Sequence, residues 1–387
     1  MPYDQKKIVE AIRAFERGEI VVVMDDDGRE NEGDLIVAAV HCTPEKMAFI
    51  IRHTSGIVCT PMPREEAKRL NLSPMVADND SAHTTAFTVS VDFKHGTTTG
   101  ISADDRTLTV RNLANGNVGG SDFVRPGHIF PLIAKDGGVL MRSGHTEAAI
   151  DLCRFASVEP VAAICELVND DGTVMRGPQI TAFAKKHALK RISVANLIAY
   201  RQAREKLVTR VAEFAIETEA GEFAGYAYVT PFDKVHHYAF VYGEIGDGRG
   251  VPTRLHRGNV VEDVFGGAKT IHAALTRFKD AGRGVLVYLR DGTSGVPTMA
   301  IAEASAIAED CTASERERNR EWREVGLGAQ ILRDLRISSI RLYATRERSY
   351  VGLAGFGIEI ESTETIEDAS NHRLTLRKPR DGSASDC

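Results

Sequence analysis

The chain has 387 residues, more than one hydrophobic core usually holds, so its length predicts two domains. Its formal net charge of −6 gives no general attraction for nucleic acid or for an anionic membrane. No apolar run is long enough for a signal peptide or a membrane helix, and the six cysteines include no C-x-x-C pair. These features predict a cytoplasmic protein with reduced thiols and a small-molecule ligand, and they argue against nucleic-acid and membrane partners.

The first predicted elements are an amphipathic helix over residues 4–17 and a buried, β-branched strand over 20–24. The strand ends in an acidic loop, 25–34, which reads DDDGRENEGD and holds six carboxylates and one arginine. A cation, or a hydroxylated ligand that carries one, would relieve so much like charge. A solvated acidic loop is the plainer interpretation and stays open here. An EF-hand calcium loop does not fit, because Glu30 stands where that loop needs glycine.

Shorter elements follow in the order strand, helix, strand, at residues 35–40, 44–51 and 56–60. Residues 86–92 then alternate apolar and polar side chains, which predicts a strand with one polar face toward a cleft. After a Thr/Gly loop, Ser102 and Asp105 form a capping box that opens a helix. Such a loop is able to bind phosphate through hydroxyls and amides, although the motif alone is a weak signal.

Two histidines each follow a glycine. His128 comes after a Pro-Gly turn, and His145 directly precedes a predicted helix over residues 146–155. Either histidine alone would be read as structural, but the pair together with Arg142 favours a functional site. Because helix N-termini attract anions, Arg142, Gly144 and Thr146 surround a place suited to a phosphate group.

Glu166 stands in the middle of an otherwise apolar strand predicted over residues 161–168. A carboxylate in that position is paired, protonated or functional, because an unpaired buried charge is costly. Structural pairing and catalysis both stay open. A turn at residues 169–172 and helices over 178–189 and 193–205 complete a first domain, 1–205.

The second half predicts a layered α/β or α+β domain over residues 206–370. Its expected strands cover 211–218, 238–245 and 284–290, and its expected helical segments cover 269–279 and 299–323. The polar tail, 371–387, is expected to be disordered.

Seven motifs in the first domain resemble 3,4-dihydroxy-2-butanone 4-phosphate synthase of riboflavin biosynthesis. In chain order they are DDDGRENEGD, SGIVCTPM, HTTAFTVSVD, TTTGISADDR, DFVRPGHIFPL, RSGHTEAAIDL and CEL. The resemblance implies an α+β (mixed α/β) fold and a homodimeric lyase. It also implies a reaction that converts D-ribulose 5-phosphate to L-3,4-dihydroxy-2-butanone 4-phosphate and formate.

The same resemblance implies roles for individual residues. Glu30 and His145 are expected to bind Mg²⁺ or Mn²⁺, and His128 and Glu166 are expected to be catalytic. The substrate is expected to contact Arg29, Glu30, Asp34, Arg142, Ser143, Gly144, His145, Thr146 and Glu166.

The second domain resembles GTP cyclohydrolase II through GEFAGYAY, HHYAFVYGEI, GRGVLVYLR and GAQILRDLRISSIRL. That family binds zinc through three cysteines, yet residues 254–275 contain none, and DGTSGVP at 291–297 replaces its arginine-containing segment. The resemblance therefore implies an inactive domain without zinc. Two alternatives stay open: a bifunctional enzyme with other zinc ligands such as His256 and His272, and a nucleotide sensor or scaffold.

Overall fold

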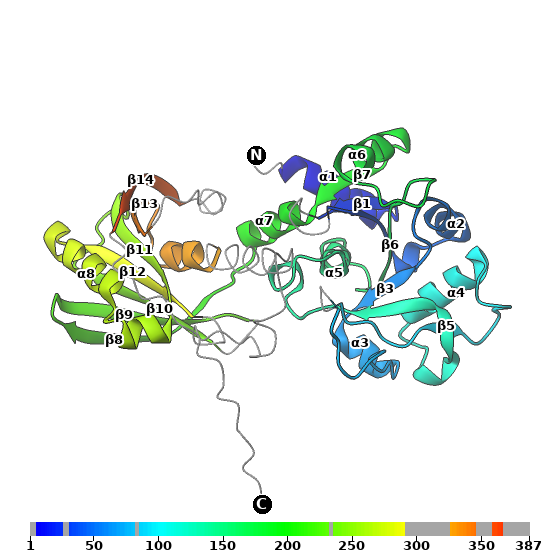
Figure 1. Cartoon of the computed structure of the whole chain (residues 1–387), viewed down its shortest axis with the longest axis horizontal. Coiled ribbons are helices and arrows are strands. Elements are labelled where there is room, and N and C mark those ends of the chain that lie inside the picture. Colours follow the sequence, from blue (N-terminus) through cyan, green and yellow to red (C-terminus); the bar gives the residue numbers. More distant parts are fainter. Residues whose placement is uncertain are drawn as a thin grey trace, which may run out of the picture.

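The computed structural model describes residues 5–25, 31–81, 85–231, 235–290, 326–345 and 358–366. They form two seven-stranded sheets, one in each half of the chain, and the chain passes from one to the other after helix α7 (Figure 1). Within these ranges no helix combines the length and the apolar composition that crossing a bilayer requires. The expected mixed α/β fold is confirmed.

The first sheet has the strand order β4-β5-β3-β6-β2-β1-β7. Its strands are β1 Val21–Met24, β2 Gly33–Ala38, β3 Cys59–Met62, β4 Val91–Phe93, β5 Phe123–Ile133, β6 Ala162–Glu166 and β7 Lys190–Ser193. Its helices are α1 Gln5–Glu16, α2 Pro44–His53, α3 Arg64–Arg69, α4 Ala103–Leu113, α5 His145–Phe155, α6 Gly177–Lys186 and α7 Val194–Arg204. Short 3₁₀ turns lie at η1 Ala39–His41, η2 Gly120–Asp122 and η3 Gly138–Leu140.

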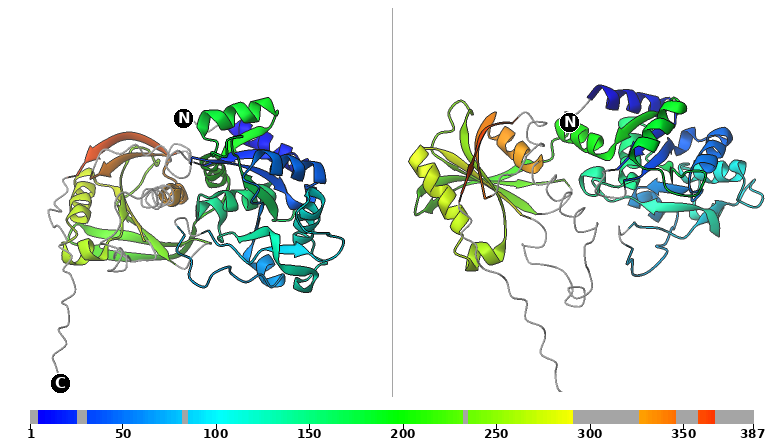
Figure 2. Two further views of the ribbon diagram at one scale, coloured as in Figure 1. Left: turned by 45° about the vertical axis from the view of Figure 1, so that its right-hand side comes forward. Right: turned by 45° about the horizontal axis from the view of Figure 1, so that its top comes forward.

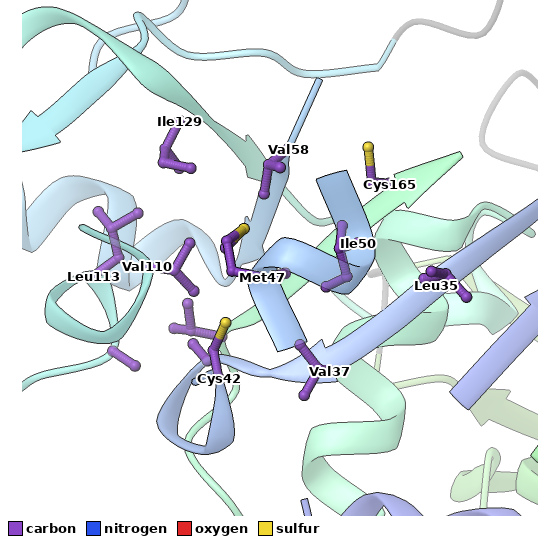
Figure 3. Packing of buried hydrophobic residues seen from close by; sticks show 14 of the residues in the cluster. Leu35, Val37, Cys42, Met47, Ile50, Val58, Val110, Leu113, Ile129 and Cys165 are labelled. Atoms are coloured by element: carbon purple, nitrogen blue, oxygen red, sulfur yellow. The ribbon is translucent and has the colours of Figure 1, made fainter. Parts of the chain in front are cut away.

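Alternate residues of the central strands face two separate cores, so the sheet is covered on both sides. Val22 and Leu35 pack with α2, α4 and α6, and Figure 3 shows Met47 and Ile50 of α2 beside Leu35 and Val37 of the sheet. Val21, Val23 and Ile36 pack with α1, α5 and α7 on the other face. All these strand residues are fully buried, which explains the continuous apolar run in the sequence.

Local signals predicted most elements of the first half well. The helix expected over 4–17 is α1, and Gly18 ends it in the left-handed region at φ 84°. Thr43 caps α2, and Ser102 caps α4 by accepting from the Asp105 amide. The expected turn at 169–172 also occurs, with Val168 bridging Val174 beyond it.

Three local predictions were wrong. Asp34 lies inside β2, not in the acidic loop, because pairing with β1 extends the strand back to Gly33. Only the end of the strand expected over 86–92 is regular, as β4, since residues 87 and 88 form isolated bridges to other segments. Glu166 ends β6 instead of occupying its middle. Strand β7, which pairs in parallel with β1, was not predicted.

The second sheet has the order β14-β13-β11-β12-β10-β9-β8. Its strands are β8 Thr209–Thr218, β9 Gly221–Val229, β10 His236–Tyr242, β11 Val251–Arg257, β12 Gly284–Leu289, β13 Ser339–Ala344 and β14 Glu359–Thr365. One face of this sheet packs with a helix over 326–334, and the other face packs with α8 Lys269–Ala281. A π-helical turn, η4 Val261–Phe265, follows β11. Figure 2 shows α8 lying along this sheet.

In the second half, β8, β10, β12 and α8 confirm the expected elements, whereas β9, β11, β13 and β14 were not predicted. Several expectations fall outside the described residues. These are the helical segment at 299–323, the tail at 371–387, and the site residues Arg29 and Glu30.

Candidate active site

Two carboxylates face each other across neighbouring central strands of the first sheet, where β2 begins and β6 ends. The antiparallel register of β2 and β6 places Asp34 directly opposite Glu166. Both side chains point to the face that carries Ile36 and Ile164, because side chains alternate along a strand. Asp34 is 2% exposed, and Glu166 accepts a hydrogen bond from Ser55 Oγ at 2.8 Å. Like charges that face each other in this way favour a nearby cation.

His145 joins the carboxylates from the helix that covers this face. It is the first residue of α5, and Gly144 caps that helix in an extended conformation. Its Nδ1 lies 3.4 Å from Asp34 Oδ1, and both side chains are more than nine-tenths buried. A carboxylate this close orients the imidazole ring, as carboxylates commonly do for metal-binding histidines. The structure therefore brings together three of the predicted site residues, Asp34, His145 and Glu166.

Two buried cysteine thiols near these carboxylates have raised pKa values. Burial raises the pKa of Cys59 well above its usual value, and the charges of Glu166 and Asp34 raise it further. Burial likewise raises the pKa of Cys165 to about 11, although hydrogen bonds with Ser55 and Thr54 lower it in part. Both thiols are thus protonated at neutral pH and are poor nucleophiles. Cys59 is a buried free thiol.

His128 is oriented by a partner that the sequence analysis missed. Its Nδ1 lies 2.7 Å from Asp92 Oδ2, and its backbone N–H donates to Asp92 Oδ1 at 2.9 Å. Asp92 is 9% exposed, whereas the His128 side chain is 42% exposed and can be reached from solvent. The signal for Asp92 was the polar face predicted over residues 86–92. Ser90 on that face accepts from the Gly127 amide at 3.2 Å.

The expected Pro-Gly turn before His128 lies inside β5 as a bulge. Asp92 pairs with Val124 while the preceding residue, Val91, pairs with Ile129, so residues 125–128 loop out of the ladder. Gly127 is required there, because a Cβ on it would lie 2.0 Å from the Val91 carbonyl carbon. The bulge re-aims the chain so that His128 meets Asp92.

The Thr/Gly loop packs against the Asp92–His128 pair. Gly100 has φ +84°, and a Cβ on it would lie 2.0 Å from Asp92 Oδ2. Asp105 holds this loop by accepting from the Thr98 amide, the Thr98 hydroxyl and the Gly100 amide at 2.8–3.0 Å. These hydrogen bonds, led by that from the Thr98 amide, lower the pKa of Asp105.

Arg142 lies at the N-terminus of α5, where the sequence placed a phosphate site. Its Nη1 lies 2.7 Å from Glu147 Oε2, and its Nη2 donates to Thr85 Oγ1 at 2.8 Å. A Cβ on Gly144 would lie 2.3 Å from Arg142 Nη1, so only glycine lets the guanidinium approach the helix end. Ser143 and Thr146 are buried beside it.

His128 and Glu166 lie on the same face of the sheet, on β5 and β6, with β3 between them. Two strand spacings separate such positions by about 10 Å. Within the described residues no three His, Cys, Asp or Glu side chains form a metal-binding group. Glu30, expected to complete one with His145, is outside them.

Comparisons with known proteins assign each half of the chain to a family. Residues 9–200 match the family model for 3,4-dihydroxy-2-butanone 4-phosphate synthase, and residues 209–366 match that for GTP cyclohydrolase II. Riboflavin biosynthesis protein RibBA of Bacillus cytotoxicus is 43% identical over 364 residues, which are 92% of this chain and 91% of that protein. The bifunctional riboflavin biosynthesis protein RIBA 1, chloroplastic, of Arabidopsis thaliana is 44% identical over 91% of this chain and 67% of that protein.

Two solved structures are also similar. RibBX, a two-domain 3,4-dihydroxy-2-butanone 4-phosphate synthase from A. baumannii, has a TM-score of 0.76 and 36% identity. The match covers 92% of this chain and 99% of RibBX. A 3,4-dihydroxy-2-butanone 4-phosphate synthase in complex with two magnesium ions has a TM-score of 0.50 and 46% identity, over 51% of this chain and 97% of that one.

The first sheet and the carboxylates and histidines beside its strand ends thus define a sugar-phosphate enzyme domain, followed by a second α/β domain of another enzyme family. The chain belongs to the RibBA family of riboflavin biosynthesis proteins, in which a 3,4-dihydroxy-2-butanone 4-phosphate synthase domain precedes a GTP cyclohydrolase II domain. Its function is the synthesis of 3,4-dihydroxy-2-butanone 4-phosphate in riboflavin biosynthesis.

Proposed function

We propose that the carboxylates and histidines beside the strand ends of the first sheet form the active site of a lyase that converts D-ribulose 5-phosphate to L-3,4-dihydroxy-2-butanone 4-phosphate and formate. The observation that carries this proposal is the direct opposition of Asp34 and Glu166, with His145 beside Asp34. In this proposal His128 and Glu166 are catalytic, and Glu30 and His145 hold the divalent ion. The sugar phosphate contacts Arg29, Glu30, Asp34, Arg142, Ser143, Gly144, His145, Thr146 and Glu166.

The donor set fits Mg²⁺ or Mn²⁺. Carboxylate oxygens suit both ions, and the imidazole of His145 would add a nitrogen ligand. The similar synthase that was solved with two magnesium ions supports the use of such a cation. When bound, the cation would act as a Lewis acid that stabilises negative charge developing on the substrate oxygens.

Proton transfers would fall to His128 and Glu166. Asp92 holds Nδ1 of His128, so Nε2 is the ring nitrogen that exchanges a proton with the sugar. Ser55 holds the Glu166 carboxyl group at the end of its strand. Because their strand positions are about 10 Å apart on one face, the two groups can act on different parts of a five-carbon sugar.

The phosphate group would lie at the N-terminus of α5. The backbone amides there and the positive end of the helix dipole attract an anion. Glu147 and Thr85 hold the Arg142 guanidinium beside this helix end, where the guanidinium would donate hydrogen bonds to phosphate oxygens.

Formate release from ribulose 5-phosphate, with and without Mg²⁺, tests this proposal. Glu30→Gln should abolish formate release at limiting Mg²⁺ and leave the melting temperature unchanged, because the ion loses a charged ligand. Full activity of this variant under those conditions would remove Glu30 from the proposed ligands.

We propose further that the chain has two domains, 1–205 and 206–370, with a tail at 371–387, and that the second domain lacks GTP cyclohydrolase activity and zinc. Residues 254–275 contain no cysteine, and His256 there lies 2.9 Å from Asp263, which also accepts from Tyr288. The similar RibBX, called a two-domain synthase, supports this proposal. The bifunctional relative from Arabidopsis favours the alternative of residual cyclohydrolase activity.

Zinc analysis of the purified chain and incubation with GTP separate these two possibilities. We expect zinc well below one ion per chain and no formate from GTP. Ring opening of GTP at an enzymatic rate would instead establish a bifunctional enzyme. Binding of GTP without turnover would support a nucleotide sensor.

We also propose that the enzyme is a cytoplasmic homodimer. Four cysteines within the described ranges are buried free thiols, namely Cys42, Cys59, Cys153 and Cys165, as suits a reducing compartment. The dimer is an implication of the family resemblance. Light scattering on the purified chain should give twice the 42.2 kDa chain mass, and a mass of one chain would contradict it.

A further inference from the structure

A buried ion pair supports the loop between β5 and α5. Asp151 of α5 and Arg201 of α7 are 1% and 6% exposed, and Arg201 Nη1 lies 3.0 Å from Asp151 Oδ2. Val139 N donates to the same Asp151 oxygen at 2.9 Å, and Arg201 Nη1 donates to Gly137 O. A Cβ at Gly138 would lie 2.3 Å from Asp151 Oδ1. The backbone of the loop at residues 137–139 therefore contacts the Asp151–Arg201 ion pair directly.

The other edge of the same guanidinium reaches the linker between the two sheets. Arg201 Nε and Nη2 donate to the two carboxylate oxygens of Glu205 at 2.7 and 2.6 Å. Gln330, on the helix over 326–334, donates from Nε2 to Glu205 O at 2.7 Å and accepts from Leu207 N at 2.5 Å. Gln330 is 8% exposed, so these hydrogen bonds have little competition from water.

Leu140 forms a second link between the domains. It lies in η3, within the loop, and packs both against the core under α5 and against the core of the second sheet. The loop continues directly into Arg142 and the N-terminus of α5. Two independent contacts, one polar and one apolar, thus join the loop to the second domain.

We propose that the second domain holds the substrate-binding loop, residues 135–145, in place through Leu140 and through the chain Gln330–Glu205–Arg201. This inference rests on the proposed function, in which Arg142 and the start of α5 bind the phosphate group. Arg201, Gln330 and Leu140 are positioning residues that touch no substrate. Because small misplacements of binding groups cost up to about a hundredfold, weakening either link should raise KM for ribulose 5-phosphate.

The polar link is tested in the full-length chain with Arg201→Lys and Gln330→Glu. Lysine keeps the charge but cannot bond Asp151 and Glu205 through one planar fork. Gln330→Glu keeps the shape but sets a carboxylate oxygen against the Glu205 carbonyl oxygen. We expect KM to rise about tenfold or more in each variant, with a smaller change in kcat. The matched controls are Arg204→Lys and Arg333→Gln, which are exposed on the same two helices and should leave KM unchanged.

The apolar link is tested with Leu140→Ala and Leu140→Met. Alanine removes the contact with the second core, whereas methionine keeps most of the volume. KM should rise in Leu140→Ala and return close to that of the wild type in Leu140→Met. If Arg201→Lys does not fold, the comparison of Leu140→Ala with Leu140→Met still tests the proposal.

Two failures are distinguishable in these measurements. Absence of formate from the wild-type chain would remove the proposed function itself. With an active wild type, an unchanged KM in Gln330→Glu and Leu140→Ala would overturn the inference. A lowered melting temperature with unchanged KM in the folded fraction would also overturn it, because the links would then be only structural.

Discussion

Replacing Asp92 by Asn tests whether His128 acts through its orientation. Asp92 accepts from both the backbone N–H and Nδ1–H of His128. An asparagine has only one acceptor oxygen. If that oxygen keeps the backbone N–H, its NH₂ group faces Nδ1, and the ring proton must move to Nε2. The flipped amide would restore the ring proton on Nδ1 but would set NH₂ against the backbone N–H.

Either arrangement removes a hydrogen bond to a charged group, worth about 1.5–3 kcal/mol. A misplaced ring proton also prevents Nε2 from accepting one, and general acid–base catalysis contributes about 10² or more to turnover. We therefore expect kcat for formate release to fall at least about a hundredfold, equivalent to about 2.7 kcal/mol of barrier.

The assay is formate release under saturating ribulose 5-phosphate and Mg²⁺, with a thermal melt of the same preparation. The control is Asp104→Asn, which makes the same substitution at an exposed position in the first turn of α4 and should leave kcat unchanged. A wild-type kcat in Asp92→Asn would refute the reasoning. A lower melting temperature with unchanged turnover in the folded fraction would reduce Asp92 to a structural role.

Gly100→Ala should lower both turnover and melting temperature, since its Cβ would collide with the aspartate beside His128; Gly116→Ala, with open space around it, is the control. Glu166→Gln should lower turnover by about 10² and change Mg²⁺ binding little, and an unaltered turnover would remove it from the catalytic groups. Hydrogen bonds lower the pKa of Asp105 below its usual value of 3.8. The ionised Asp105 carboxylate therefore stabilises the fold fully above pH 3.8, and this stabilisation is lost as pH falls through the folded-state pKa. Asp105→Asn should therefore lose less stability than the wild type on acidification below pH 3.8, as measured by denaturant unfolding; equal losses would contradict this.

Local sequence patterns determined most of the first domain's elements. The β-branched run at 21–23, the glycine after α1, and the caps at Thr43 and Ser102 each act within a few residues. Their conformational preferences are therefore readable without the rest of the chain. The same local logic predicted that α5 begins at residue 146, one residue after its observed start at His145. In the second domain, four of the seven strands were missed, because their identity depends on partners far along the chain.

Only the tertiary structure decided how the site residues meet. Asp34 opposes Glu166 because β2 pairs with β6 across more than 120 residues, and no local pattern specifies that register. Asp92 reaches His128 because a bulge in β5 turns the chain, and Leu140 is shared because two cores approach the same loop. The sequence alone determined which residue types and motifs are present. Strand pairing and packing, which depend on long-range burial, determined which of those groups lie within reach of one another.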